Sequence, residues 1–210
     1  MPELGLFPLP LVLVPTERIP LHIFEPRYKE LIAECVEEGE EFGLVLAAGD
    51  GAVHEVGTRA AVTEVLEELP DGSMNIIVEG GDRFRLLELG HARSFTTAVV
   101  EEVVDDDDPV DETEADRAFE LFGRLAETAG AEVDSPARDS PLLDFELAAR
   151  VDFGTEAKQE LLASISPRDR MTRLVSLLET ALETVKLERE LQERASGNGK
   201  VSPLGPSDPD

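Results

Sequence analysis

The hydrophobic pattern of this chain changes its period once, near residue 104, and this change constrains the fold more than any other feature. Before that point, apolar residues occur in short runs or alternate with polar ones, and turn sequences separate the runs. Such a pattern predicts β-strands. After that point, apolar residues recur every three or four positions, as on one face of a helix. The sequence therefore predicts an α+β protein, with a β-rich lobe followed by a helical lobe.

The β-rich lobe is expected to contain five or six antiparallel strands that form a small barrel-like sheet with one inserted helix. The expected strands are 4–7, 11–14, 42–47, 56–69, a strand from Met74 to Val78, a short strand through Phe84 and Leu86, and 95–104. Polar turns are expected at 16–18, 69–73 and 79–82. Pro26 suits the first turn of the helix and Gly39 is placed to end it. This helix is expected to cover one opening of the sheet.

Four helices are predicted in the second half. The first carries Ala118, Leu121, Phe122 and Leu125 on one face and ends at Gly130, the second covers 142–148, the third covers 156–163 with Thr155 as a possible N-cap, and the fourth begins after Ser166. The apolar stripe of the fourth helix runs from Met171 to Val185. We expect this stripe to pack within the bundle, although its far end could contact a partner helix.

A strongly acidic segment separates the two halves. Ten of the sixteen residues from Glu101 to Asp116 are acidic, and charge repulsion of this kind opposes packing. A calcium site is the alternative, but the segment lacks the glycine and the terminal glutamate of an EF-hand loop. The predicted organisation is a β-rich lobe at 1–104, an exposed acidic linker at 105–116, a helical bundle at 117–194 and a disordered tail at 195–210.

Composition excludes several classes of partner. The 210 residues are too few for a complete ATP-driven protease, and 19 basic against 46 acidic residues give a net charge of −27. This charge repels nucleic acid and anionic membrane surfaces, so neither is an expected partner. The single cysteine, Cys35, cannot form an internal disulfide, and the N-terminus lacks the basic start of a secretory signal. A cytoplasmic protein is therefore expected.

Catalytic motifs are incomplete throughout. His54-Glu55 would open a zinc-protease motif, but residue 58 is threonine, and His22 and His91 are isolated in the sequence. Residues 197–201 are superficially similar to a phosphate-binding loop, but lack its first glycine and its final Ser or Thr. No Gly-x-Ser-x-Gly motif occurs. We therefore expect no catalytic residue, no metal site and no cofactor.

One set of motifs rises above composition. It comprises LFPL at 6–9, PLHIFEPRY at 20–28, FGLVL at 42–46, VGTRA at 56–60, DGS at 71–73, GDRFR at 81–85, AVVE at 98–101, LAA at 147–149, EAKQELL at 156–162 and DRMTRL at 169–174. The set closely resembles the Lon N-terminal domain, also called the Lon substrate-binding domain, over residues 4–190. Thr16-Glu17, where the family often has a glycine, and Phe95-Thr96, where a tyrosine is common, depart from the pattern and suggest a diverged member.

The resemblance implies a PUA-like pseudobarrel with one helix, joined to a C-terminal helical bundle. In full-length Lon proteases this domain recruits unfolded or tagged substrates and helps the ring assemble, while separate ATPase and Ser-Lys protease domains act on them. We expect a stand-alone, non-catalytic member that binds unfolded or extended polypeptides, as an adaptor or holdase, with a protease or chaperone as an open further partner. Self-association is also left open. The alternatives are an ATP-independent peptidase or hydrolase, and a small-ligand or RNA sensor that uses the barrel.

The run from Pro20 to Tyr28 holds the candidate polypeptide-binding residues, which are Leu21, His22, Phe24, Glu25, Arg27 and Tyr28. A purely structural interpretation is favoured over ligand contact. In that interpretation the apolar residues cap the barrel, Arg27 pairs with a carboxylate, and Tyr28 donates a hydrogen bond to a buried carbonyl. An apolar cleft between the two lobes is the second place where an extended polypeptide could bind.

Overall fold

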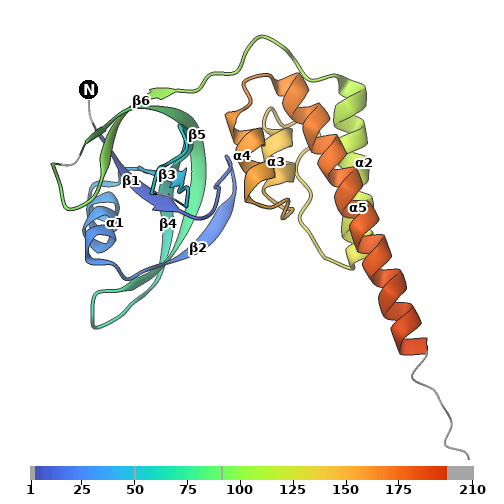
Figure 1. Ribbon diagram of the computed structural model, residues 1–210, viewed down its shortest axis with the longest axis horizontal. Helices are drawn as coiled ribbons and strands as arrows, with labels where there is room; N and C mark the ends of the chain where they lie inside the picture. Colours follow the sequence, from blue (N-terminus) through green and yellow to red (C-terminus); the bar gives the residue numbers. More distant parts are fainter. Residues whose placement is uncertain (1–2, 50, 91, 198–210) are drawn as a thin grey trace, which may run out of the picture.

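A β-barrel lobe and a helical lobe lie side by side in the computed structural model, which describes residues 3–49, 51–90 and 92–197 (Figure 1). The expected α+β class and the order of its two parts are confirmed. Among the described residues, no helix combines the length and apolarity that crossing a bilayer requires.

Six strands form the first lobe. They are β1 (Leu4–Leu9), β2 (Arg18–Ile23), β3 (Phe42–Leu46), β4 (Val56–Glu68), β5 (Met74–Gly90) and β6 (Thr97–Glu102). Their order in the sheet is β2-β5-β4-β3-β1-β6, and an additional β5–β6 pairing closes the sheet on itself. All pairs are antiparallel except β1–β3, which is parallel, so the expectation of a wholly antiparallel sheet is wrong at this pair.

The turn expected at 79–82 does not exist, because β5 continues through both glycines for 17 residues. At Gly80 the strand is crossed by the loop that precedes β2. The amide of Thr16 donates to the Gly80 carbonyl, and the Gly80 amide donates to the carbonyl of Glu17. Residues 11–14, expected as a strand, belong to this crossing loop, and Arg18, expected in a turn, begins β2.

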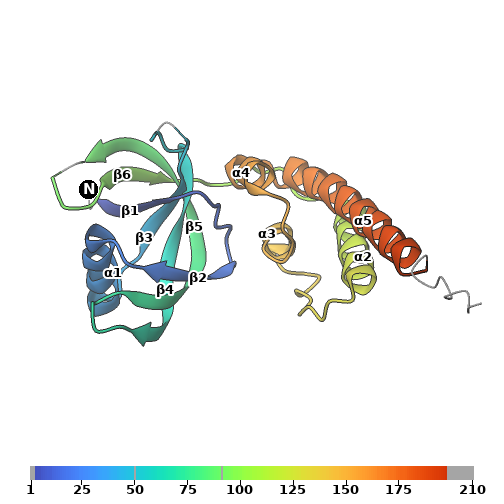
Figure 2. The same cartoon turned by 60° about the horizontal axis from the view of Figure 1, so that its bottom comes forward.

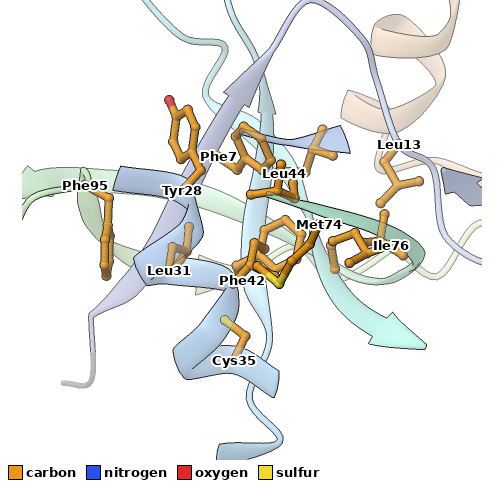
Figure 3. Close-up of a cluster of buried hydrophobic side chains, with 14 residues drawn as sticks. Phe7, Leu13, Tyr28, Leu31, Cys35, Phe42, Leu44, Met74, Ile76 and Phe95 are labelled. Atoms are coloured by element: carbon orange, nitrogen blue, oxygen red, sulfur yellow. The ribbon is translucent and has the colours of Figure 1, made fainter. Parts of the chain in front are cut away.

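The helix inserted between β2 and β3 is α1 (Pro26–Glu38), which begins at the expected proline. Gly39 ends it in the left-handed conformation, at φ 69°. Its apolar face packs into the barrel core with Phe7, Phe42 and Met74 (Figure 3). Burial, helped by nearby glutamates, raises the pKa of the Cys35 thiol to about 11, so this thiol is protonated at neutral pH.

Four helices form the second lobe, as expected: α2 (Glu112–Ala129), α3 (Leu143–Ala148), α4 (Thr155–Ala163) and α5 (Pro167–Gly197). Gly154, at φ 79°, precedes α4, so Thr155 is the first helical residue rather than the N-cap. Ser166 is confirmed as an N-cap residue, since its hydroxyl accepts a hydrogen bond from the Asp169 amide at 3.0 Å. Helix α2 begins inside the segment expected as a linker, and α5 extends into the segment expected as a tail.

The lobes meet at a seam of buried charges. Arg83 on β5 donates to the carbonyl oxygens of Leu162 and Ser164, at 2.9 and 2.6 Å. Arg170 on α5 donates to Asp144 at 2.6 Å, and both guanidinium groups lie over the ring of Phe145. Figure 2 shows α4 on the side of the helical lobe that faces the barrel. The seam therefore ties β5 directly to α4 and α5.

Part of the acidic segment belongs to this seam, so the expectation of an exposed solvated linker is wrong there. Asp105 pairs with both Arg83 and Arg170, and Asp108 accepts hydrogen bonds from Ser166 and Arg168, each at 2.8 Å. Burial acts to raise the pKa of Asp105, but the hydrogen bonds and charges of the two arginines outweigh it and hold the pKa below its usual value. The carboxylate of Asp105 is thus a structural counter-ion.

Candidate functional site

Strand β2 has an unpaired edge. It lies at the end of the sheet order and, among the residues that the structure describes, pairs only with β5. In an antiparallel pair, the backbone N–H and C=O groups of successive residues point alternately toward and away from the partner strand. The hydrogen bond from the Gly80 amide to the Glu17 carbonyl shows which residues of β2 point toward β5. The backbone groups of Ile19, Leu21 and Ile23 therefore face β5, while those of residues 18, 20 and 22 face the unpaired edge. Pro20, which has no N–H, is tolerated there for this reason.

A groove of about 580 Å³ lies beside this strand. Its lining residues are Pro20, Leu21, His22, Leu66, Glu67, Asn75 and Ile76. They come from β2 and from the β4–β5 hairpin, which extends beyond the barrel in Figure 1. Leu66 is 53% exposed, and Phe24, directly after β2, is 61% exposed. The groove therefore combines an unpaired strand with large apolar side chains that face solvent.

A chain of polar contacts forms one wall of the groove. The His22 Nδ1 lies 2.7 Å from the Asn75 Oδ1, and the Asn75 amide nitrogen donates to Glu67 at 3.1 Å. Because an amide oxygen only accepts, this arrangement places the proton on Nδ1. The imidazole also stacks on the ring of Phe24, with centroids 5.8 Å apart. These contacts orient the His22 ring and hold Phe24 beside the groove.

The other half of the predicted motif has a structural role. Arg27 pairs with Glu25 at 2.8 Å and lies over the ring of Tyr28. Tyr28 is buried, with its ring centroid 4.1 Å from that of Phe7. Burial raises the pKa of the Tyr28 hydroxyl, although the charge of Arg27 opposes the shift. The structure thus places Leu21 and His22 in the lining of the groove, with Phe24 stacked on His22, and the remaining three residues at the start of α1.

The cleft expected between the lobes is present, and its lining is mixed. A groove of about 620 Å³ lies there, and most of its lining residues are polar: His54, Glu55, Arg85, Glu156, Gln159 and Glu160, with Leu46, Val56 and Ala163. Gln159 is 8% exposed and donates its amide nitrogen to the carbonyl of Val56 at 3.1 Å. The lobes therefore share a groove in which charged side chains lie among apolar ones.

The sequence motifs do not include the outer face of the β4–β5 hairpin, which contributes to the groove. Val65 and Leu66 are consecutive residues of β4, and both are more than 40% exposed. Two adjacent apolar residues within a run of glutamates break the alternation of a half-buried strand, and β4 has a register irregularity between Val65 and Glu67 at this place. That signal was present in the sequence and could have identified the groove.

The histidines and acidic residues do not form a metal centre in the described parts of the chain. Within residues 3–49, 51–90 and 92–197, no group of three or more His, Cys, Asp or Glu side chains is arranged to hold an ion. His22 and His54 line different grooves. His91 and residues 198–201 of the loop-like sequence lie outside the described residues.

Comparison with known proteins gives relatives over most of the chain. It is 24% identical over 198 residues to Lon protease 1 of Hydrogenovibrio crunogenus and 27% identical over 204 residues to the Lon protease of Anaeromyxobacter dehalogenans. These alignments cover 87% and 89% of this chain but 24% of each relative. The chain thus spans about a quarter of the length of these relatives.

Solved structures share the fold. The Lon N-terminal domain protein from Xanthomonas campestris superposes with a TM-score of 0.67 at 26% identity, covering 84% of this chain and 98% of that one. The N-terminal domain of the Mycobacterium avium complex Lon protease gives 0.68 at 14% identity, covering 85% and 98%. The family model described as the ATP-dependent protease La (LON) substrate-binding domain matches residues 3–180. The chain therefore belongs to the Lon substrate-binding domain family.

Proposed function

We propose that the protein binds extended polypeptide segments without cleaving them, at the outer edge of β2 and the adjoining groove that runs across β2, β5 and β4. The observation that carries this proposal is the unpaired β2 edge beside exposed Leu66 and Phe24. Membership of a substrate-binding family supports a polypeptide ligand. The bound segments would be delivered to a protease or chaperone partner in the cytoplasm, in keeping with a single buried cysteine.

Binding at this groove would combine main-chain and side-chain contacts. An added strand would accept hydrogen bonds from the outward amides of Arg18 and His22, while Pro20 between them limits the paired length. Side chains of the segment would then contact His22 and Phe24, and those on the groove face would extend across β2 toward Leu66. Three exposed glutamates on β4, at positions 64, 67 and 68, favour neutral or basic segments over acidic ones.

A binding titration tests the proposal with reduced, carboxamidomethylated ribonuclease A as a permanently unfolded probe that carries no added carboxylates. We expect binding in the micromolar range by fluorescence anisotropy, and a loss of at least tenfold in the Phe24→Ser/Leu66→Ser variant, which corresponds to about 1.4 kcal/mol. Leu87→Ser is the matched control, because Leu87 is also 53% exposed but lies in the β6-paired half of β5.

Two results would contradict the proposal. One is no binding at high micromolar concentration by protein with a native circular dichroism spectrum. The other is an equal loss of affinity in the Leu87→Ser variant, which would mean that any exposed leucine contributes to binding regardless of its place. Incubation with casein separates binding from cleavage: we expect intact casein, whereas fragments formed without ATP would favour the peptidase alternative.

A further inference from the structure

The helical lobe contains a second apolar hollow that the proposed function does not use. It has a volume of about 450 Å³ and lies between α2, α5 and residues 131–133 and 150–153. Its large apolar lining side chains are Phe122, Leu125, Val133, Phe153, Leu177 and Val185. The hollow belongs to the lobe that lies away from the β2 groove (Figure 1). A hollow of this size accommodates one or two large apolar side chains.

The hollow continues as a stripe along α5. Thr180 and Thr184 line the hollow, and Leu187 and Leu191 follow at steps of three and four residues, so all four share one helix face. Both threonine hydroxyls donate to carbonyl oxygens one turn earlier, at 2.9 Å, which satisfies their polar atoms within the helix. Leu187 and Leu191 are 58% and 54% exposed. Figure 1 shows this part of α5 projecting beyond the end of α2. The hollow, Leu187 and Leu191 together are called the docking face.

Charges beside the docking face define its partner. Glu183 and Glu190 border the stripe on one side and Glu188 borders it on the other, and all three are exposed. Glu190 pairs with Arg194 of its own helix at 3.6 Å, whereas Glu183 and Glu188 form no ion pair within the described part of the chain. A parallel second copy of α5 in register would bring Glu183 against Glu183 and Glu188 against Glu188, which is repulsive. Basic side chains in the flanking positions of a partner would be attracted.

We propose that the docking face binds an amphipathic helix of a partner protein, in which Lys or Arg residues flank the apolar stripe. One large apolar residue of that helix enters the hollow, and residues one and two turns further along contact Leu187 and Leu191. Flanking basic residues then pair with Glu183 and Glu188. This inference goes beyond the proposed function, since it concerns a helical ligand, a different lobe and a different surface.

The experiment uses synthetic helical peptides of 21 residues, labelled with fluorescein and titrated with the full chain. One peptide has leucines at the a and d positions and lysines at e and g. A second has glutamates in place of those lysines, and a third is a scrambled sequence of the first. We expect micromolar binding of the lysine peptide and at least tenfold weaker binding of the other two, because only the first matches both stripe and charge.

Variants assign the binding to the docking face. Leu187→Ser/Leu191→Ser should weaken binding of the lysine peptide at least tenfold. Both side chains are exposed, so the variant should keep the fold. Glu183→Lys/Glu188→Lys should reverse the preference toward the glutamate peptide. Leu66→Ser should leave helix binding unchanged, so that failure of this inference and failure of the β2 groove are measured separately.

Three results would overturn the inference. If the scrambled peptide bound as tightly as the lysine peptide, the binding would depend on net charge alone and not on an apolar stripe. A dimer in sedimentation experiments that Leu187→Ser/Leu191→Ser abolishes would make a second copy the occupant. Truncation after Gly197 that strengthens peptide binding tenfold would make the C-terminal segment of the same chain the occupant.

Discussion

Gly80 lies where the loop before β2 crosses the longest strand of the barrel. A Cβ atom at this position would lie 2.2 Å from the Val14 carbonyl oxygen and 3.0 Å from its carbonyl carbon. Both atoms belong to the backbone, so neither can move aside by a change of rotamer. The absence of a side chain, rather than an unusual backbone angle, is what this site requires.

Substitution at this position tests that statement. Gly80→Ala should lower the free energy of unfolding by about 2–3 kcal/mol, because the loop and β5 must separate to admit the methyl group. Gly123→Ala is the matched control. Gly123 is a helical residue of α2, and a Cβ atom there would meet no neighbouring atom within 4 Å, so alanine should raise stability by about 0.5–1 kcal/mol. Urea unfolding measures both, and an unchanged midpoint for Gly80→Ala would contradict the steric account.

At the scale of elements, the residues at the start of α5 both cap this helix and hold the acidic segment that joins the lobes. The Ser166 hydroxyl accepts from the Asp169 amide and donates to Asp108, while the Ser166 carbonyl accepts from the Arg170 amide. Pro167 occupies the first helical position, where its missing N–H costs nothing. The same serine thus satisfies the helix terminus and secures the acidic segment.

Removal of this hydroxyl should be measurable. Ser166→Ala should destabilise the protein by about 1 kcal/mol, a typical cost for loss of an N-cap side chain. Ser176→Ala provides the control, because Ser176 is exposed in the interior of α5 and alanine is the better helix former. Thermal unfolding followed by circular dichroism should give a lower midpoint for the first variant alone. Equal midpoints would show that the cap contributes nothing to α5.

At the scale of the whole molecule, the relation between the lobes depends on charges that are hidden from water. The side chains of Arg83 and Arg170 are 5% and 3% exposed, and Asp105 lies between them. Removing one charged side chain from such a group leaves another charge buried without a partner, which lowers the stability of the fold. A second link, between Lys158 of α4 and Glu17 of the crossing loop at 2.5 Å, is also largely buried.

The seam predicts a specific pH dependence. The pKa of Asp105 is lower in the folded protein than its ordinary value, so its ionised form stabilises the fold at neutral pH and that contribution is lost as pH falls through the folded pKa. Asp105→Asn should therefore cost about 1–2 kcal/mol at pH 7, with allowance for solvent screening, and less at pH 3, below the ordinary pKa of the carboxyl. Urea midpoints at the two pH values measure this difference.

Asp107→Asn serves as the comparison in the same segment. Asp107 is exposed and forms no ion pair within the described ranges. Its variant should keep the pH dependence of the parent protein, since all other carboxylates are common to both. If Asp105→Asn and Asp107→Asn lost the same stability at pH 7, the seam would not depend on the Asp105 carboxylate.

Local signals predicted much of the fold. Pro26 and Gly39 delimit α1 as expected, and Ser166 with Pro167 starts α5. The prediction of a turn at 79–82 was wrong, because β5 continues through this segment. A glycine pair is compatible either with a turn or with the close approach of another segment, and the sequence does not distinguish the two. For the site, Leu21 and His22 of the predicted residues line the groove, whereas Leu66, far from that motif in sequence, was missed.

By itself the sequence determined the class of fold, the order of the two lobes, the position of several helix ends and the family resemblance, because each of these depends on residues close together along the chain. Only the tertiary structure decided which carboxylates of the acidic segment are counter-ions and which strand edge stays unpaired. Asp105 meets arginines 22 and 65 residues away, and Leu66 of β4 lines the same groove as residues 20–22 of β2. Contacts across such separations depend on how the whole chain packs, and local patterns carry no record of them.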